Sequence, residues 1–313
     1  WCVDHAASGR YDASRGFACV ATVADAPMSQ NGSDRKGSRF PLRLDQVAAQ
    51  RPAAAREVLR PQAHLQAVER ERRIQAQSVP QGLGLDSVHV RRRMVERLHA
   101  DGLQHPLVLD AFARLPRHLF VDTALVNQAY EDTSLPIGLG QTISKPSVVG
   151  AMIALLCTRP GLKSAASDVA RPLGNCLEIG TGCGYQAALL ALLARQVVSI
   201  ERLRDLHLKA RQNLDTLRHS QPGWPDVRLV YGDGMLGHPP LAPYDTIIAA
   251  AGGAQLPQSW LDQLAPGGRL VAPMSDPRGT GQVLTVVDRH ADGRLEQTVS
   301  GAVLFVPLKS GIT

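Results

Sequence analysis

The sequence predicts an α/β fold in which a mostly parallel, doubly wound sheet follows an N-terminal helical subdomain. From residue 176 onward, short apolar runs of strand length alternate with longer runs at helical spacing. Such alternation specifies parallel strands with helices on both faces of the sheet. In addition, a glycine-rich turn follows the first of these strands. A chain of 313 residues that is 44% hydrophobic is long enough to bury the core that this fold needs.

Residues 1–84 differ in composition from the rest and are predicted to be a low-complexity, Arg- and Ala-rich, poorly ordered extension. The chain begins at Trp1, and Met28 is a candidate natural start. The first hundred residues hold 16 Lys and Arg against 10 Asp and Glu, whereas the remainder holds 18 of each. Such a basic arm could contact nucleic acid or an anionic surface. Because no aromatic residues are interleaved with the arginines of residues 51–93, we favour a solvated extension and expect no nucleic-acid partner.

Helices open the predicted domain, which spans residues 85–313. Asp86-Ser87 forms an N-cap pair for a helix with apolar residues at helical spacing over 90–98, and Gly102 ends that helix. The other helices of this region are expected over 106–115 and 147–156. Between them, residues 130–145 are rich in turn formers and are predicted to be a polar loop.

The strands that follow are short and apolar. They are predicted over 176–179, 197–200, 227–231, 246–249 and 269–272, with a closing pair over 283–288 and 299–306. The helices between them are predicted over 186–194, 203–217 and 257–264. Ligands of such sheets bind outside the carboxyl ends of the strands. The loops that follow the strands are therefore where we expect a site.

A glycine loop joins the first predicted strand to its helix. Gly180, Gly182 and Gly184 alternate with other residues, and Glu178 stands two places before the first of them. Glycines allow unusual backbone angles and let a ligand approach the main chain. A dinucleotide-binding loop would require a small residue three places after Gly182, where this chain has Tyr185. The spacing instead suits a ligand with an amino-acid end and no pyrophosphate.

Two more acidic residues end the next two strands. Glu201 follows the second strand, and Asp233 follows the third between two glycines. The first can accept hydrogen bonds from ribose hydroxyls, and the second from an adenine amino group. Each acid alone could equally be a helix cap or a surface residue. Together with Glu178 they outline a pocket for S-adenosylmethionine.

Several longer motifs make the chain resemble the protein-L-isoaspartate O-methyltransferase family over about residues 85–313. They are Pro116-Arg117-His118-Leu119-Phe120-Val121, Ala129-Tyr130-Glu131-Asp132, Leu135-Pro136-Ile137-Gly138, Gly140-Gln141-Thr142-Ile143-Ser144-Lys145-Pro146, Ala242-Pro243-Tyr244-Asp245-Thr246-Ile247-Ile248, Leu264-Ala265-Pro266-Gly267-Gly268-Arg269-Leu270 and Phe305-Val306-Pro307-Leu308. The resemblance implies a Rossmann-like class I methyltransferase fold. Generic methyltransferases share the glycine loop but lack the stretch between residues 116 and 146.

The resemblance also implies an activity and its residues. A methyl group would pass from S-adenosylmethionine to the α-carboxyl of an L-isoaspartyl residue in damaged proteins and peptides, and the ester would then collapse to a succinimide and start repair. Ser144 matches the active-site serine of the family. The cofactor positions that the resemblance implies are Gln141, Thr142, Ile143, Glu178, Gly180, Thr181, Gly182, Gly184, Glu201, Asp233 and Gly234.

The implied chemistry needs few catalytic groups. A carboxylate is already ionised at neutral pH, so no general base is required. Placing oxygen, methyl carbon and sulfur in line and removing water from the carboxylate are the main tasks of the protein. The Ser144 hydroxyl suits the first task, although a serine in front of Pro146 could instead cap the following helix. The histidines lack metal-ligand spacing, so no metal is expected.

Three alternatives stay open. The chain could methylate another carboxylate or a small molecule, act as an NAD-dependent oxidoreductase, or be an inactive binding module whose basic arm is the working part. Two departures from the family pattern leave the implied activity in place: Cys183 replaces a common serine, with cofactor binding expected to survive, and Gly252-Gly253 could loosen the loop near the substrate. Five cysteines without a CxxC pair favour a reducing, cytoplasmic setting. No apolar run reaches membrane-spanning length, and a monomer is expected.

Overall fold

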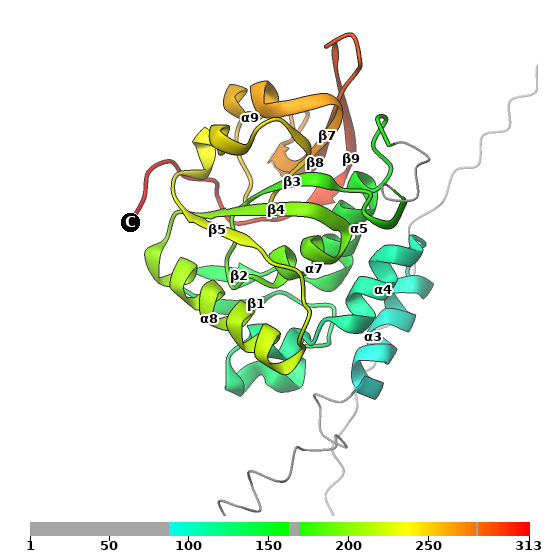
Figure 1. Ribbon diagram of the computed structural model, residues 1–313, viewed down its shortest axis with the longest axis vertical. Helices are drawn as coiled ribbons and strands as arrows, with labels where there is room; N and C mark the ends of the chain where they lie inside the picture. The colour runs from blue at the N-terminus through cyan, green and yellow to red at the C-terminus, as the bar shows by residue number, and fades with distance from the viewer. Residues whose placement is uncertain (1–87, 163–168, 280) are drawn as a thin grey trace, which may run out of the picture. The chain divides into compact units, whose positions relative to one another are not determined.

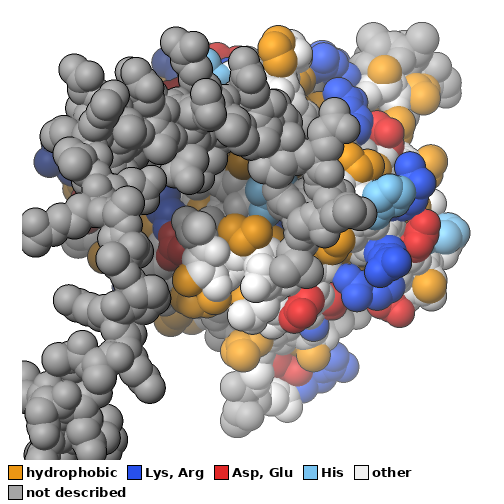
Figure 2. All heavy atoms as spheres, turned by 90° about the horizontal axis from the view of Figure 1, so that it is seen from below, with side chains coloured by type: hydrophobic (Ala, Val, Ile, Leu, Met, Phe, Trp, Pro, Cys, Tyr) orange, Lys and Arg blue, Asp and Glu red, His pale blue; other side chains and the backbone are white. Residues whose placement is uncertain are grey.

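The computed structural model describes residues 88–162, 169–279 and 281–313 (Figure 1). The predicted extension over 1–84 and the N-cap pair Asp86-Ser87 lie outside these residues. Among the residues it describes, no helix is long and apolar enough to cross a membrane. On the face shown in Figure 2, basic and acidic side chains lie close to one another where they are visible.

A seven-stranded sheet forms the centre of the fold, with the strand order β5-β4-β3-β6-β7-β8-β9. The strands are β3 (Gly174–Ile179), β4 (Ala194–Glu201), β5 (Arg228–Tyr231), β6 (Tyr244–Ala249), β7 (Leu264–Ser275), β8 (Gln282–Arg289) and β9 (Leu295–Val303). The pairs among β5, β4, β3, β6 and β7 are parallel, whereas β8 and β9 are added antiparallel. The predicted mostly parallel sheet is therefore confirmed.

Side chains alternate between the two faces of the sheet, as the two-residue period of a strand requires. In β3, Cys176 belongs to one apolar cluster and Leu177 to the other, and Val197 and Val198 of β4 divide in the same way. On the Cys176 side lie α5 (Pro146–Leu156), α7 (Tyr185–Leu193) and α8 (Arg204–Ser220). On the other side, α9 (Gln258–Gln263) buries Trp260 against the sheet. Helices thus cover both faces, as the doubly wound prediction requires.

The N-terminal helices α3 (Val88–Ala100) and α4 (Pro106–Arg114) lie side by side (Figure 1). Gly102 follows α3 with a φ of 111°, a left-handed conformation that glycine adopts easily. Pro106 begins α4, where its missing N–H leaves no hydrogen bond unmade. Both boundaries agree with the sequence-based prediction, and both helices contribute to the larger apolar cluster.

Two sequence-based predictions are wrong in part. The segment expected to be a polar loop contains an antiparallel hairpin, β1 (Leu135–Gly138) and β2 (Gln141–Ile143), whose strands are too short to show a clear period. The last strand, expected over 299–306, begins earlier and ends at Val303, because the tight turn after β8 places Leu295 directly opposite Arg289. Residues 304–308 leave the sheet and line the cavities described below.

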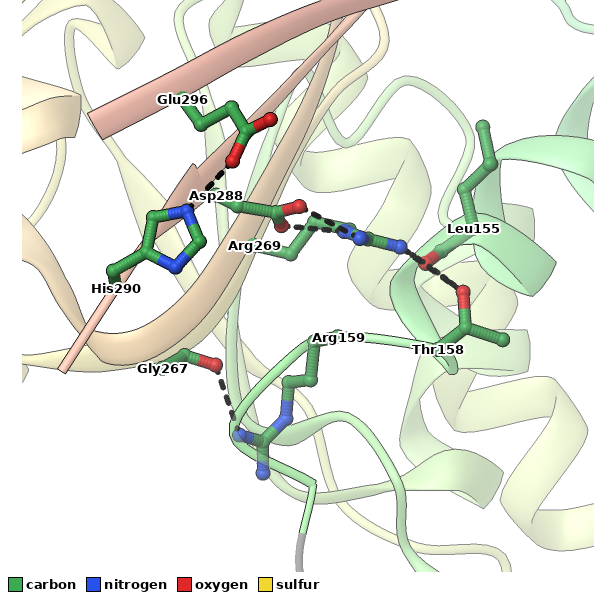
Figure 3. A network of polar contacts seen from close by, with 8 residues as sticks. All are labelled: Leu155, Thr158, Arg159, Gly267, Arg269, Asp288, His290 and Glu296. Atoms are coloured by element: carbon green, nitrogen blue, oxygen red, sulfur yellow. Dashed lines mark hydrogen bonds and ion pairs between the residues drawn. The ribbon is translucent and has the colours of Figure 1, made fainter. Parts of the chain in front are cut away.

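A network of polar contacts fixes α5 to the antiparallel part of the sheet (Figure 3). The Arg269 guanidinium donates to both carboxylate oxygens of Asp288, at 2.6 and 2.8 Å, which joins β7 to β8. Its Nη1 donates to the carbonyl oxygen of Leu155 in the last turn of α5, at 2.8 Å. Because α5 begins two residues after Ser144, this contact also helps to place the serine segment.

Candidate functional site

A cavity of about 260 Å³ opens at the carboxyl ends of the parallel strands. The strand register sets Ile179 beside Ile200 and Glu201 beside Tyr231, so β3, β4 and β5 end at one edge. The predicted site residues that line this cavity are Gln141, Thr142, Ile143, Ser144, Gly180, Thr181, Gly182, Glu201 and Gly234. The structure therefore brings together segments that are up to 93 positions apart in the sequence, from Gln141 to Gly234.

The glycine loop has the backbone that its sequence predicted. Gly180, Gly182 and Gly184 have φ values of 89°, 58° and 91°, which other residues rarely adopt. The Gly180 N–H donates to the Ile200 carbonyl at 2.9 Å, which ties the loop to the end of β4. Gly184 does not line the cavity; it caps α7, and a Cβ there would lie 3.4 Å from Ala210. The absence of a side chain at residue 184 therefore allows α7 and α8 to pack closely.

The Glu201 carboxylate accepts a hydrogen bond from the glycine loop. Oε2 accepts the Gly182 N–H and Oε1 accepts the Leu203 N–H, both at 2.9 Å. Burial raises the pKa of Glu201, and the backbone N–H groups that it accepts oppose that shift. Each oxygen keeps a second lone pair, so the carboxylate can still accept hydrogen bonds from a ligand in the cavity.

Glu178 is fully buried and does not line the cavity. Its Oε2 accepts a hydrogen bond from the Ser199 hydroxyl, and the Ser199 oxygen lies 2.6 Å from the Thr181 hydroxyl oxygen. Thr181 does line the cavity, so two hydroxyl groups connect the buried Glu178 to the site. Burial raises the pKa of Glu178 to about 8, a shift that the hydrogen bond from Ser199 partly offsets.

Asp233 is also not part of the cavity lining. Its Oδ1 accepts the Met235 N–H at 2.9 Å, and its Oδ2 accepts the Gly311 N–H at 2.6 Å. The second contact holds the C-terminal segment, residues 309–313, against the ends of β4 and β5 (Figure 1). Among the three predicted acids, the structure therefore places only Glu201 directly on the cavity.

Ser144 lies half-buried between β2 and α5. Among the described residues its hydroxyl has no hydrogen-bond partner. The capping interpretation is wrong, because Lys145 occupies the N-cap position of α5 and the carboxylate of Asp132 bonds the Ser147 N–H and hydroxyl at 2.7 Å each. With α5 capped by Asp132, the Ser144 hydroxyl is left available to a ligand.

A second cavity, of about 470 Å³, adjoins the first. The two share Thr142, Ser144, Ala250 and Val306, so the serine lies at their boundary. Residues 302–306 and Lys145 form other parts of its wall. One cavity thus ends at the glycine loop and the other opens toward the segment after β9.

The two departures from the family pattern have clear structural settings. Gly252 is held by backbone hydrogen bonds to Val306 and Leu308, both at 2.8 Å, so its loop is anchored on the C-terminal segment. Cys183 is buried, and burial raises the pKa of its thiol to about 11. It therefore stays a neutral thiol near neutral pH. Among the described residues, no group of His, Cys, Asp and Glu is arranged to hold a metal ion.

Sequence reasoning missed several residues of the site. Arg202 and residues 306–309 line the first cavity, and Arg117 lies behind the serine segment, where it bonds the Ser144 carbonyl. Arg117 and part of the 306–309 stretch lie within the family motifs. The sequence of a motif does not predict which of its side chains face the cavity. Arg202 directly follows Glu201 and has no pattern of its own.

Comparison with known proteins decides the family. Residues 89–313 match the family model for protein-L-isoaspartate(D-aspartate) O-methyltransferase. The chain belongs to this family. A protein-L-isoaspartate O-methyltransferase of Methylibium petroleiphilum is 59% identical over 283 residues, which cover 90% of this chain and 99% of that protein. One of Leptothrix cholodnii is 54% identical over 293 residues, covering 91% and 98%. Both alignments are longer than the match to the family model and take in part of the predicted extension.

Solved structures agree on the fold. A protein-L-isoaspartate O-methyltransferase structure superposes with a TM-score of 0.59 at 26% identity, covering 71% of this chain and 67% of that one. A Plasmodium falciparum beta-aspartate methyltransferase, in complex with S-adenosyl-L-homocysteine, gives 0.57 at 21% identity, covering 70% and 98%. These structures confirm the predicted class I methyltransferase fold, and the family match and the curated relatives confirm S-adenosylmethionine-dependent methyltransferase activity.

Proposed function

We propose that the chain transfers a methyl group from S-adenosylmethionine to the α-carboxyl of L-isoaspartyl residues in damaged proteins and peptides. The observation that supports this proposal most directly is the position of Ser144 at the boundary of two cavities, one built on the glycine loop and one on the segment after β9. A methyltransferase must bring donor and acceptor together from two sides, and this arrangement provides a place for each.

The first cavity fits the methyl donor. Glu201 offers carboxylate oxygens to the ribose hydroxyls, and the positive-φ backbone of the glycine loop allows the amino-acid end to approach the main chain. A Cβ on Gly182 would lie 3.2 Å from the Ile137 side chain, so glycine at this position lets the loop pack closely against that residue. Once bound, S-adenosylmethionine supplies an electrophilic methyl group on a sulfonium.

On the acceptor side, the protein has to orient a carboxylate and exclude water. The Ser144 hydroxyl can donate a hydrogen bond to one carboxylate oxygen and leave the other free to attack. No side chain has to remove a proton, because the carboxyl group is ionised at neutral pH. Good orientation of two reactants can be worth roughly 7–11 kcal/mol of the barrier. We assign the orienting role to Ser144 and cofactor binding to the glycine loop and Glu201.

The test uses two peptides that differ only at one residue. The purified chain is incubated with S-adenosylmethionine labelled in its methyl group and either an isoaspartyl peptide or the same peptide with normal aspartate. We expect base-labile label in the first peptide only. Equal labelling of both, or label that appears only in an unrelated carboxylate compound, would replace this proposal with that of a broader carboxyl methyltransferase.

We also propose that the chain works as a monomer in the cytoplasm. One chain supplies both cavities, and the described cysteines Cys157, Cys176 and Cys183 are free and buried, which is compatible with a reducing compartment. Light scattering of the purified chain tests the oligomeric state, and cell fractionation tests the compartment.

A further inference from the structure

Arg117 is a charged residue in an uncharged setting. It opens the short 3-10 helix Arg117–Phe120, and its side chain is fully buried. Within the ranges that the structure describes, no Asp or Glu forms an ion pair with it, and its Nε and Nη1 atoms have no hydrogen-bond partner. Burying a cation without a counter-charge is costly. Packing alone does not account for an arginine at this position.

The guanidinium joins the two parts of the site. Its Nη2 donates to the main-chain oxygen of Ser144 at 3.0 Å, and its central carbon lies 4.6 Å from the centroid of the Tyr185 ring. Ser144 stands at the boundary of the two cavities, whereas Tyr185 directly follows the glycine loop and begins α7. One planar group is therefore in contact with the serine segment and with the end of the glycine loop.

The Tyr185 ring is itself held in place. It is 1% exposed, and Phe120 packs against it edge-on with ring centroids 5.6 Å apart. A cation over an aromatic face is attracted by the ring, more strongly when both are desolvated. Because the guanidinium is rigid and planar, the position of the Ser144 carbonyl relative to Tyr185 is fixed by one short connection.

We infer that Arg117 is a positioning residue for methyl transfer. It holds the serine segment at a set distance from the glycine loop, so that the acceptor carboxylate meets the donor methyl group in line. This inference rests on the proposed function. Because displacement of a reacting group by about 1 Å can cost on the order of 100-fold in rate, a small shift of the serine segment is enough to slow the reaction.

The test compares Arg117→Met with a matched variant, Arg159→Met. Arg159 is also buried, but it bonds the Pro172 carbonyl at 3.1 Å, pairs with Asp245 and contacts Gly267 away from both cavities (Figure 3). Both variants are expected to lower the melting temperature. Only Arg117→Met is expected to lower kcat, by about 30-fold or more, while the Kd for S-adenosylhomocysteine stays within threefold; Arg159→Met should keep kcat within twofold of wild type.

Two further measurements separate positioning from general damage. Arg117→Lys keeps the charge but not the planar fork, so we expect an intermediate kcat, about three- to tenfold below wild type, and this variant also serves if Arg117→Met does not fold. Combining Arg117→Met with Ser144→Ala should reduce kcat by much less than the product of the single effects, because the first change acts through the second residue.

The possible failures are distinguishable. A wild-type chain that leaves the isoaspartyl peptide unmethylated would refute the proposed function. An active wild type in which Arg117→Met retains as much kcat as Arg159→Met, or in which the effects of Arg117→Met and Ser144→Ala simply multiply, would overturn the positioning role alone.

Discussion

Ser144 is the residue whose side chain the proposed reaction uses most directly. Its hydroxyl has no partner in the described part of the chain and lies where the two cavities meet. Replacing it with alanine should lower kcat tenfold or more, because the carboxylate loses the hydrogen bond that orients it. Binding of S-adenosylhomocysteine, measured by calorimetry, should change by less than twofold.

Ser147→Ala is the matched control for Ser144→Ala. This serine is three residues further along and uses its hydroxyl to bond Asp132 at the start of α5. The loss of this side-chain hydrogen bond should cost about 1 kcal/mol of stability and leave kcat within twofold, because the backbone N–H of residue 147 keeps its bond to Asp132. If the two alanine variants had the same kcat, Ser144 would have no special part in the reaction.

Glu201 is the acid that we expect to matter most for donor binding. Its two oxygens each accept a backbone N–H, from Gly182 and Leu203. Glu201→Gln leaves one acceptor oxygen for these donors and for the ribose hydroxyls. Hydrogen bonds to charged groups contribute roughly 1.5–3 kcal/mol, so affinity for S-adenosylhomocysteine should fall by about 10- to 100-fold. Glu296→Gln, at an exposed ion pair with His290, is the control; equal affinities would contradict the role of Glu201.

At the residue scale, spacing along the sequence predicted the glycine loop and the position of Glu201 well. It did not predict that Glu178 is buried and bonded to Ser199, or that both carboxylate oxygens of Asp233 accept hydrogen bonds from backbone N–H groups. Both outcomes depend on which face of the strand end a side chain takes and on what packs over it. The C-terminal segment that bonds Asp233 is about 80 residues away in sequence. No local sequence pattern predicts that the two segments are in contact.

At the scale of elements, every predicted helix and strand of the described domain is present. The errors are the missed hairpin, the early start of β9 and the start of β7, which begins at Leu264 and not at residue 269. The hairpin of β1 and β2 was missed because its strands have four and three residues. The pairing of the two strands is stabilised by burial of Leu135, Ile137 and Ile143 in the core. This hairpin carries Gln141, Thr142 and Ile143, so a hairpin that the sequence did not reveal supplies part of the site.

The C-terminal segment is predicted to support donor binding. Residue 313 exchanges backbone hydrogen bonds with Arg202 and Arg204, at 3.0 and 2.8 Å, and Arg202 Nε donates to the Gly311 carbonyl at 2.8 Å. These contacts steady the turn that directly follows Glu201. Removing residues 310–313 should therefore weaken S-adenosylhomocysteine binding by about three- to tenfold, with a change in KM for the donor that exceeds the change in kcat.

The truncation needs a control that also removes exposed backbone contacts. Asp292→Ala is suitable, because it deletes a carboxylate hydrogen bond to the Arg294 N–H at the turn between β8 and β9, outside both cavities. Affinity should be unchanged in this variant. If the truncated and the full chain bound the donor equally well, the C-terminal segment would have no role in donor binding.

For the whole molecule, the buried carboxyl group of Glu178 couples stability to pH. Its pKa in the folded protein is raised to about 8 by burial, whereas it is about 4.5 without burial. Between these values the folded state holds a proton that the unfolded state has lost. Stability is therefore highest below the unfolded pKa and falls as pH rises, until the folded group ionises near pH 8.

Histidines change the stability with pH in the opposite direction and at lower pH. Burial lowers the pKa of His105, His207 and His238, so their effect is a loss of stability as pH falls below about 6.5. Buried thiols titrate well above pH 8. The histidines still contribute at pH 6.5, where about half of them are protonated in the unfolded chain, so the effect of a raised carboxyl group is read from the difference between the wild type and a variant that lacks it.

Urea unfolding of the whole chain at pH 6.5 and pH 8 tests this coupling. The Glu178 carboxyl should cost the wild type about 2 kcal/mol of unfolding free energy over the interval, since each pKa unit corresponds to about 1.4 kcal/mol. Glu178→Gln stays neutral throughout and should remove most of that loss. Its amide adds a buried donor, which lowers stability equally at both pH values and leaves the difference between them unaffected. A pH dependence that is the same in both chains would mean that Glu178 is ionised in the folded protein despite its burial, with Ser199 and Thr181 stabilising a charge behind the donor cavity.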